Sequence, residues 1–357
     1  MNINITDKNW ASVDNKDTPQ NCDENGTYIC LDKNITIVIL PHHFKIDANL
    51  SNANDGNFTY LSKDLKMAAT LDINISAKNK LNNTTQNYTA ACYAKDTNFS
   101  ISYSEINNTL SKIFYQDSNT SDKKEAPLNH AIVFDRNGTL FASENKGLAR
   151  VHLLINFDRN RSVAVNPFSF HITEINITDA NNTEGNTTID TNTTFYYGRT
   201  HAPRQTIIGN EGNISIYYEV YCAGKTCKKT LLQDGINSKT TDDPRWFVNT
   251  KHTAQFGIAG TATQKYTDKV TETKKATGNY PDFITLHYNG KRGFPYKTTM
   301  DNNASVWLIY NKYNPNAKTN QFEVEFLNAN HGWTGKHETN STTDTNASKR
   351  TNRRIYW

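Results

Sequence analysis

The chain has 357 residues, more than one ordinary sandwich needs and enough for two or three β-domains. Its formal net charge is +4, and basic residues are scattered beside acidic ones, so the sequence does not indicate a nucleic-acid-binding surface. No apolar run approaches the ~18 residues of a transmembrane helix, and no signal peptide follows Met1. We therefore expect that any export signal lies upstream.

The composition favours strands over helices. Hydrophobic residues make up 36% of the chain and aromatic residues 11%, while Asn and Thr fill the share that Leu and Ala usually take. Asn and Thr compete for backbone hydrogen bonds within a helix, but they suit turns and strands.

Segments that alternate apolar and polar residues predict half-buried strands along most of the chain. In chain order they are 35–39, 71–76, 130–134 with 139–142, 149–156 with 162–165, 175–177, 214–221, 246–249, 283–288, 305–310 and 322–326. Asn137-Gly138 predicts a tight hairpin turn, and only residues 104–114 show a weak helical pattern. The sequence thus predicts an all-β fold of tandem β-sandwich modules, immunoglobulin-like, with long polar loops.

One polar stretch divides the chain. Residues 178–194 contain almost no apolar side chains, which predicts a loop or linker. We therefore expect an N-terminal segment (1–40) that continues from an upstream region, a β-sandwich domain (41–177), the linker (178–194) and a second β-rich domain (195–357).

The chain has five cysteines. Cys222 and Cys227 are separated by four residues, and Cys22 and Cys30 by seven, and both spacings suit a disulfide across a turn. Cys92 is left over. Unpaired thiols are the main alternative; zinc is less favoured, because the tight Cys or Cys/His sets typical of zinc sites are missing from the sequence.

The most informative feature is an acid that precedes most N-glycosylation sequons. Asn-X-Ser/Thr, with X other than Pro, occurs 22 times, which an Asn- and Thr-rich chain could produce by chance. In 18 of these the residue two positions before Asn is Asp or Glu, although acids are only 35 of 357 residues and chance predicts about two. The exceptions are Asn4, Asn82, Asn83 and Asn87.

The 18 candidate glycosylation sites are Asn25, Asn34, Asn49, Asn57, Asn74, Asn98, Asn107, Asn119, Asn137, Asn160, Asn176, Asn181, Asn186, Asn192, Asn213, Asn303, Asn340 and Asn346.

This pattern resembles the extended sequon of bacterial N-glycosylation, Asp/Glu-X-Asn-X-Ser/Thr. In a strand the acid, the Asn and the hydroxyl share one face, so a glycan on Asn would face solvent where the intervening residues are apolar. A turn motif is one alternative to glycosylation, since Asp and Asn form Asx-turns without any sugar. Calcium is a weaker one, because each triplet carries a single acid. Burial of Asn74, Asn176 or Asn213 would count against glycosylation.

The sequence indicates no enzymatic chemistry and no cofactor. Phosphate loops, nucleophile elbows and zinc-protease motifs do not occur in it. His42 and His43 would point to opposite faces of a strand, which disfavours a metal site. Trp333, between His331 and His337, is expected to anchor a loop, with a sugar-binding platform as the alternative.

Two stretches resemble the domain of unknown function in MshQ-like bacterial surface proteins, which are associated with pili. The first is Pro41-His42-His43-Phe44 followed by Asn57-Phe58-Thr59-Tyr60-Leu61, residues 71–79 and residues 84–88; the second is Phe195-Tyr196-Tyr197-Gly198-Arg199 followed by residues 216–222. The resemblance implies a large exported protein of immunoglobulin-like and lectin-like modules and supplies no catalytic residues.

We therefore expect a non-enzymatic bacterial cell-surface or extracellular glycoprotein with a structural or adhesive role, as a filament or pilus-linked subunit or as an adhesin. Its expected partners are covalent N-glycans, copies of itself and a carbohydrate or cell-surface ligand. A carbohydrate-binding module is the alternative, and a secreted hydrolase, which needs paired carboxylates across a cleft, is the third reading.

Overall fold

The computed structural model describes residues 40–53, 58–106, 109–120, 122–224, 227, 245–254, 261–290 and 293–328. It also describes the backbone of an antiparallel hairpin of β1 (Asn2–Asp7) and β2 (Ile29–Asn34). Strands dominate the described residues, so the predicted all-β class is confirmed. None of the helices in this part of the chain has the length and apolar character that a bilayer crossing requires.

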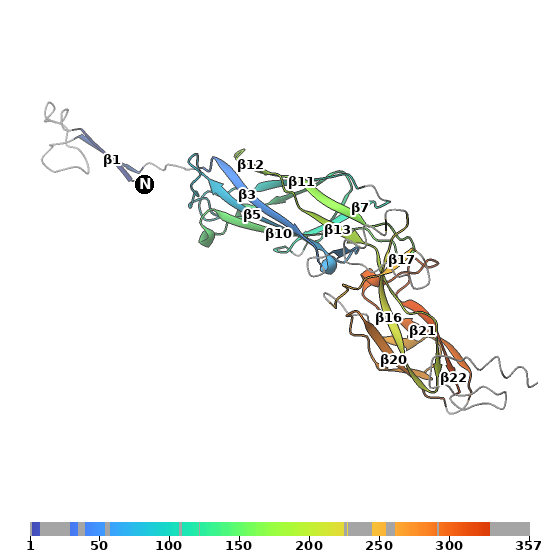
Figure 1. Cartoon of the computed structure of the whole chain (residues 1–357). Coiled ribbons are helices and arrows are strands. Elements are labelled where there is room, and N and C mark those ends of the chain that lie inside the picture. The colour runs from blue at the N-terminus through green and yellow to red at the C-terminus, as the bar shows by residue number, and fades with distance from the viewer. Residues whose placement is uncertain are drawn as a thin grey trace, which may run out of the picture.

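The first module consists of two facing sheets (Figure 1). One has the strand order β3-β5-β10-β7-β8, and the other has the order β4-β13-β11-β6-β9, with β12 also paired to β11. Neighbouring strands are antiparallel except β13 and β4. The strands are β3 (His43–Ser51), β4 (Thr59–Tyr60), β5 (Ala69–Lys78), β6 (Thr97–Tyr103), β7 (Lys112–Asp117), β8 (Lys124–Pro127), β9 (Ala131–Arg136), β10 (Leu148–Phe157), β11 (Phe168–Asp179), β12 (Glu184–Thr187) and β13 (Asn192–Tyr196).

The second module repeats this plan with fewer strands. Its sheets have the orders β14-β16-β20-β19, with β17 on β16, and β15-β22-β21-β18. The strands are β14 (Gly198–His201), β15 (Gln205–Ile208), β16 (Glu211–Tyr221), β17 (Trp246–Val248), β18 (Ala262–Gln264), β19 (Val270–Lys274), β20 (Asp282–Tyr288), β21 (Tyr296–Asn302) and β22 (Asn320–Leu327). Four 3-10 helices of one turn complete the described elements: η1 (Leu65–Met67), η2 (Gly138–Leu140), η3 (Ser143–Asn145) and η4 (Val306–Leu308).

The period of two in the sequence gives each sheet one apolar and one polar face. In β5, Leu71, Ile73 and Ile75 are buried between the sheets, while Asp72 and Asn74 face outward. The same alternation runs along β16 and β20 in the second module. Each core is therefore built from the inward residues of two sheets.

The stretch predicted as a linker, residues 178–194, is instead part of the first module. β12 pairs with β11, and β13 pairs with both β11 and β4. These strands are polar because one side of each faces solvent, and because a short strand needs few buried residues; Ile189 and Thr193 are the buried residues between 184 and 194. The first module consequently extends about twenty residues beyond the predicted boundary.

Three local predictions were also wrong. Asn137-Gly138 makes no hairpin: Asn137 has φ −73°, not the positive φ of a type I′ turn, and η2 follows while β9 pairs with β6. Residues 305–310 contain η4 rather than a strand. Residues 162–165 form no strand. The weak helical pattern of 104–114 corresponds to no helix in the described residues of that segment. Residues 35–39 lie outside the described part of the chain.

The two modules lie end to end (Figure 1), and each contributes side chains to the core of the other. Trp246 of β17 belongs to the hydrophobic cluster of the first module. Conversely, Phe58, Tyr60, Met67 and Tyr196 of the first module belong to the cluster of the second. We call this contact region the junction. Its interlocked side chains make the described molecule an elongated rod rather than two domains joined only by a linker.

Candidate glycosylation faces

The sequons with Asp or Glu two residues before Asn, which we call acid-first sequons, lie on the surface wherever the structure describes them. Of the twelve described Asn residues, eleven are exposed and Asn176 is half-buried. The exposed ones are Asn49, Asn74, Asn98, Asn119, Asn137, Asn160, Asn181, Asn186, Asn192, Asn213 and Asn303. The side chains of Asn25, Asn34, Asn57, Asn107, Asn340 and Asn346 are outside the described residues. The burial that would have counted against glycosylation is therefore not observed at Asn74, Asn176 or Asn213.

On the outer face of the first sheet, two sequons lie antiparallel and in matching register. Asp47 of β3 is opposite Asn74 of β5, and Asn49 of β3 is opposite Asp72 of β5. Each acid thus neighbours the Asn of the other sequon. Asp72 also accepts hydrogen bonds from Arg150, at 2.6 Å, and lies 2.8 Å from Nδ1 of His152. Its hydrogen bonds to His152 and Arg150 outweigh the cost of partial burial and lower the pKa of Asp72.

The opposite sheet repeats this arrangement. Asn176 of β11 is opposite Ser100 of β6 on one side and Asn186 of β12 on the other, and Thr178 is opposite Asn98. Three sequons therefore meet on one outward surface. The amide of Asn98 donates a hydrogen bond of 2.7 Å to Asp135 of β9, the acid of a fourth sequon.

The second module carries two described sequons. Asn213 of β16 accepts a hydrogen bond of 2.8 Å from the hydroxyl of Thr285, and Glu211 lies 3.2 Å from Nδ1 of His287. Asn303 follows β21 in a loop. The density of sequons is lower here than on the first module.

At some sequons the acid has a structural role that explains its presence without a glycan. Asp179 accepts hydrogen bonds from the backbone of Asn181 and Thr183 and, at 2.7 Å, from the hydroxyl of Tyr88. Asp117 caps its own turn through the backbone of Asn119 and pairs with Arg136. A turn motif thus accounts for the acid at these two turns, but not for acids that face solvent in the middle of strands.

The described cysteines match the predicted pairing. Cys222 and Cys227 form a disulfide with Cα atoms 5.7 Å apart, so this prediction is confirmed. Cys92 is a free, exposed thiol. Cys22 and the side chain of Cys30 lie outside the described residues, so their disulfide stays a prediction.

The histidines predicted as poor metal ligands lie close together. Nδ1 of His42 and Nδ1 of His43 are 3.3 Å apart at the start of β3. Among the described residues, no group of three or more His, Cys, Asp or Glu side chains is placed to hold a metal ion. Trp333, His331 and His337 lie outside the described residues.

Sequence reasoning missed a buried polar network at the junction. The hydroxyl of Tyr60 is 2.9 Å from Nδ1 of His252 and accepts a hydrogen bond of 2.8 Å from Asn249. His252 stacks on Tyr218, whose hydroxyl donates to Asp282 at 2.6 Å. Burial lowers the pKa of His252 to about 3 and raises that of Tyr60. No spacing in the sequence links Tyr60 to residues almost two hundred positions later.

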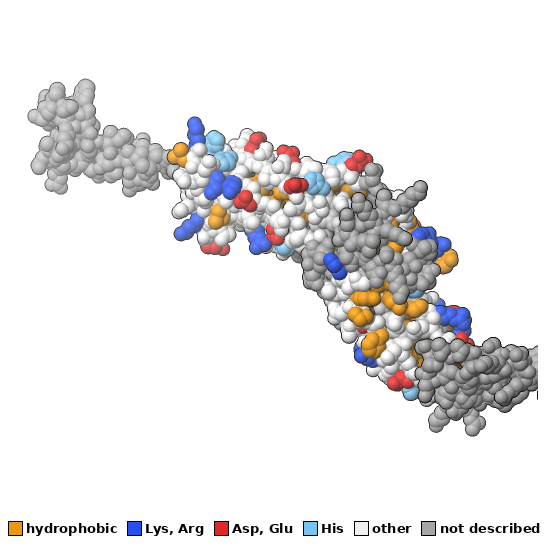
Figure 2. Space-filling view, in the orientation of Figure 1, with side chains coloured by type: hydrophobic (Ala, Val, Ile, Leu, Met, Phe, Trp, Pro, Cys, Tyr) orange, Lys and Arg blue, Asp and Glu red, His pale blue; other side chains and the backbone are white. Residues whose placement is uncertain are grey.

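Charges on the visible face of the first module are mixed, with acidic and basic side chains interspersed (Figure 2). This distribution agrees with the small net charge and with the absence of a nucleic-acid footprint in the sequence.

Comparison with known proteins gives one family match. Residues 39–197 match the model of the third domain of DUF6701, a domain of unknown function. The matched segment contains the first of the two stretches that resemble MshQ-like proteins and ends where the first module ends. No curated protein matches the chain significantly.

Two solved structures align along most of the chain at very low similarity. Domains 5–6 of the S-layer protein SbsC are 8% identical, cover 81% of this chain and 100% of their own, and have a TM-score of 0.19. An endo-fucoidan hydrolase of glycoside hydrolase family 107 is 8% identical, covers 83% of this chain and 43% of its own, and has a TM-score of 0.17. The first module is the part of the chain that is similar to the third domain of DUF6701.

Proposed function

We propose that the chain is a non-enzymatic bacterial surface or extracellular glycoprotein, in which a rod of two β-sandwiches displays N-glycans and serves a structural or adhesive role. The observation that carries the proposal is the outward orientation of the acid-first sequons: of the twelve Asn residues that the structure describes, eleven are exposed, Asn176 is half-buried and none is fully buried. A glycan is bulky and hydrophilic, so only such positions could carry one without disturbing the core.

The shared cores at the junction support the structural part of the proposal. A surface element that transmits force or holds a spacing needs modules that do not swivel, and interlocked apolar side chains restrict such motion. The match to a domain of unknown function is compatible with this role and assigns no activity.

The decisive experiment is glycopeptide mapping of the protein purified from its native host, together with its intact mass. We expect glycans on Asn192 and on other exposed acid-first sites, and none on Asn87, whose sequon lacks the acid. A mass equal to that of the bare chain would overturn the proposal.

The role of the acid is tested at Asp190, which is exposed and precedes Asn192 in β13. Replacement of Asp190 by Asn should abolish glycosylation of Asn192, whereas Asp190→Glu should preserve it, and both variants should fold normally. If Asn192 is still glycosylated in Asp190→Asn, the acid is part of a turn motif, and recognition of an extended sequon is excluded at this site.

The mode of display is tested separately by electron microscopy of the native cell surface. Ordered polymers would support a filament or layer subunit, whose self-contact should bury more than about 1,000 Å². Isolated monomers would exclude the filament and leave the adhesin.

A further inference from the structure

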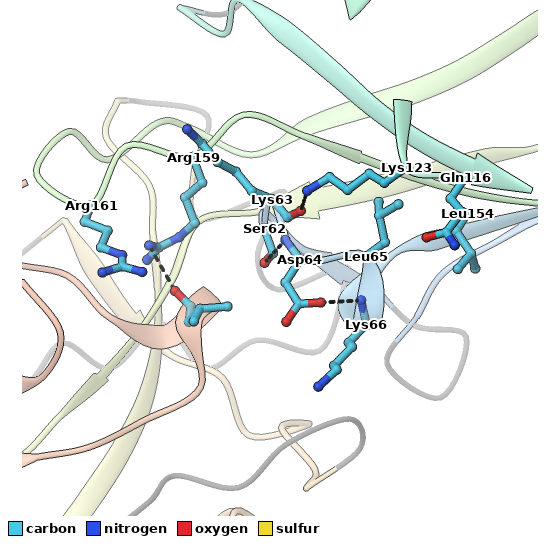
Figure 3. A pocket seen from close by; sticks show the side chains of 11 residues that line it. Ser62, Lys63, Asp64, Leu65, Lys66, Gln116, Lys123, Leu154, Arg159 and Arg161 are labelled. Atoms are coloured by element: carbon cyan, nitrogen blue, oxygen red, sulfur yellow. Dashed lines mark hydrogen bonds between the residues drawn. The ribbon is translucent and has the colours of Figure 1, made fainter. Parts of the chain in front are cut away.

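A basic hollow of about 680 Å³ opens beside the junction, and we call it the junction groove (Figure 3). Lys63, Lys66 and Lys123 line it together with Arg159 and Arg161. Asp64 is the one carboxylate among its lining residues. This concentration of positive charge contrasts with the mixed charges on the visible face of the first module (Figure 2).

Arg159 is the buried centre of the groove. Its side chain is 7% exposed and crosses the junction, donating a hydrogen bond of 2.8 Å to the carbonyl of Gly198. A second guanidinium nitrogen is 3.4 Å from the carbonyl of Val306, and the group lies 4.2 Å from the ring centre of Tyr197. Its Nε has no hydrogen-bond partner, and within the described part of the chain no carboxylate pairs with it. A buried cation without a counter-ion is costly to keep.

Arg161 adds a like charge next to it. Figure 3 shows the two guanidinium groups side by side, and Arg161 donates a hydrogen bond of 2.6 Å to the carbonyl of Ala317. Burial, and then the charge of Arg161, lower the pKa of Arg159 to about 10. The group is still charged at neutral pH, so the repulsion between the two arginines persists.

The two acids near the groove pair with only one of its five cations. Asp64 caps η1 by accepting a hydrogen bond of 3.0 Å from the backbone of Lys66. Asp158, which does not line the groove, pairs with Lys63 at 3.0 Å. The ammonium group of Lys123 donates to the carbonyl of Lys63 and lies over the ring of Phe114. Within the described residues, Lys66, Lys123, Arg159 and Arg161 therefore have no carboxylate partner.

We propose that the junction groove binds a small polyanion, a ligand that carries two or more sulfate, carboxylate or phosphate groups. One oxyanion would bridge Arg159 and Arg161, because guanidinium forks match the geometry of such groups. A second would lie near Lys66, another cation of the groove lining. The volume of the groove is within the range of sites for small ligands. Because Arg159 belongs to the first module and contacts the backbone of the second at Gly198 and Val306, the bound anion would also strengthen the junction.

The test is titration calorimetry of the full chain at constant ionic strength with three probes: sucrose octasulfate, trigalacturonate and inorganic triphosphate. We expect saturable binding at one site for at least one probe, and the preferred probe identifies the anion chemistry. Arg161→Gln should weaken binding about tenfold or more, equivalent to at least one charge-assisted hydrogen bond, and Lys66→Gln should weaken it less.

Arg204→Gln is the matched control, because it removes the same charge from an exposed side chain in the second module that faces Glu323 and Glu325. Its affinity should equal that of the wild type. Arg159 is left unchanged because it is buried and its replacement would remove both of its contacts with the backbone of the second module, whereas Arg161→Gln removes a single hydrogen bond, to Ala317. The proposal is wrong if no probe saturates, or if Arg161→Gln and Arg204→Gln bind equally, which would indicate general charge attraction.

Discussion

At the residue scale, His252 is a titratable group whose pKa burial strongly lowers. It is stacked on Tyr218 and hydrogen-bonded to Tyr60 across the junction, and Asp282 is the charged group that faces it through Tyr218. The hydroxyl of Tyr60 accepts a hydrogen bond from Asn249, which leaves its own proton available for Nδ1 of His252, and burial disfavours the charged imidazole. The imidazole is therefore held in its neutral form, and its protonation would break this network.

This burial makes the free energy of unfolding depend on pH in a defined direction. The pKa of His252 is about 3 in the folded protein, against an ordinary value of 6.5 in the unfolded chain. Its contribution to stability is complete above pH 6.5 and is lost as the pH falls towards 3, because only the unfolded chain takes up the proton. The slope should be up to about 1.4 kcal/mol per pH unit.

Urea unfolding at pH 7.5, 6.0 and 5.0 checks this prediction. His252→Gln should lose most of the pH dependence in this window, whereas His42→Gln, at an exposed position, should keep it. Equal slopes for the wild type and His252→Gln would show that His252 titrates normally.

At the scale of elements, β12 shows why the sequence misled. Its polar residues predicted a linker, yet Gly185 brings the strand against β3: a Cβ added there would lie 2.6 Å from Cβ of Phe44 and even closer to the Phe44 carbonyl oxygen. A glycine in a polar run normally indicates a loop, and nothing local reveals that its missing side chain permits close packing. Long strands such as β5, β16 and β20 were predictable because their alternation is a local signal.

In the candidate sites too, features that depend on a local sequence signal could be predicted, and features that depend on tertiary packing could not. The exposure of Asn74 and Asn213 follows from their place in alternating strands, and the pairing of Cys222 with Cys227 follows from spacing. The junction groove does not, because Lys66 and Arg161 are brought together by tertiary packing between segments about a hundred residues apart.

Gly185→Ala should therefore push β12 away from β3. We expect a loss of about 1–3 kcal/mol of stability, the usual cost of overpacking, and faster hydrogen exchange of the amides of β12. Glu184→Ala, an exposed change in the same strand, is the control and should alter neither. Unchanged exchange in Gly185→Ala would mean that β12 does not pack as closely as described.

At the scale of the whole molecule, the junction decides whether the modules act as one body. Gly198 lies at its centre: a Cβ added there would be 2.7 Å from the ring of Tyr60 and 3.2 Å from the side chain of Leu308. Its carbonyl also accepts the hydrogen bond from Arg159. Since Tyr60 and Leu308 come from different modules, Gly198 allows the two cores to meet.

We accordingly expect the full chain to unfold in a single calorimetric transition, because neither module completes its core without the other. Gly198→Val should split this transition in two, since its side chain has no space between Tyr60 and Leu308, while each sandwich keeps its own sheets. Thr206→Val, at an exposed position of β15, should leave one transition. Two transitions in the wild-type protein would show that the modules unfold independently, and the rod would then be a pair of jointed domains.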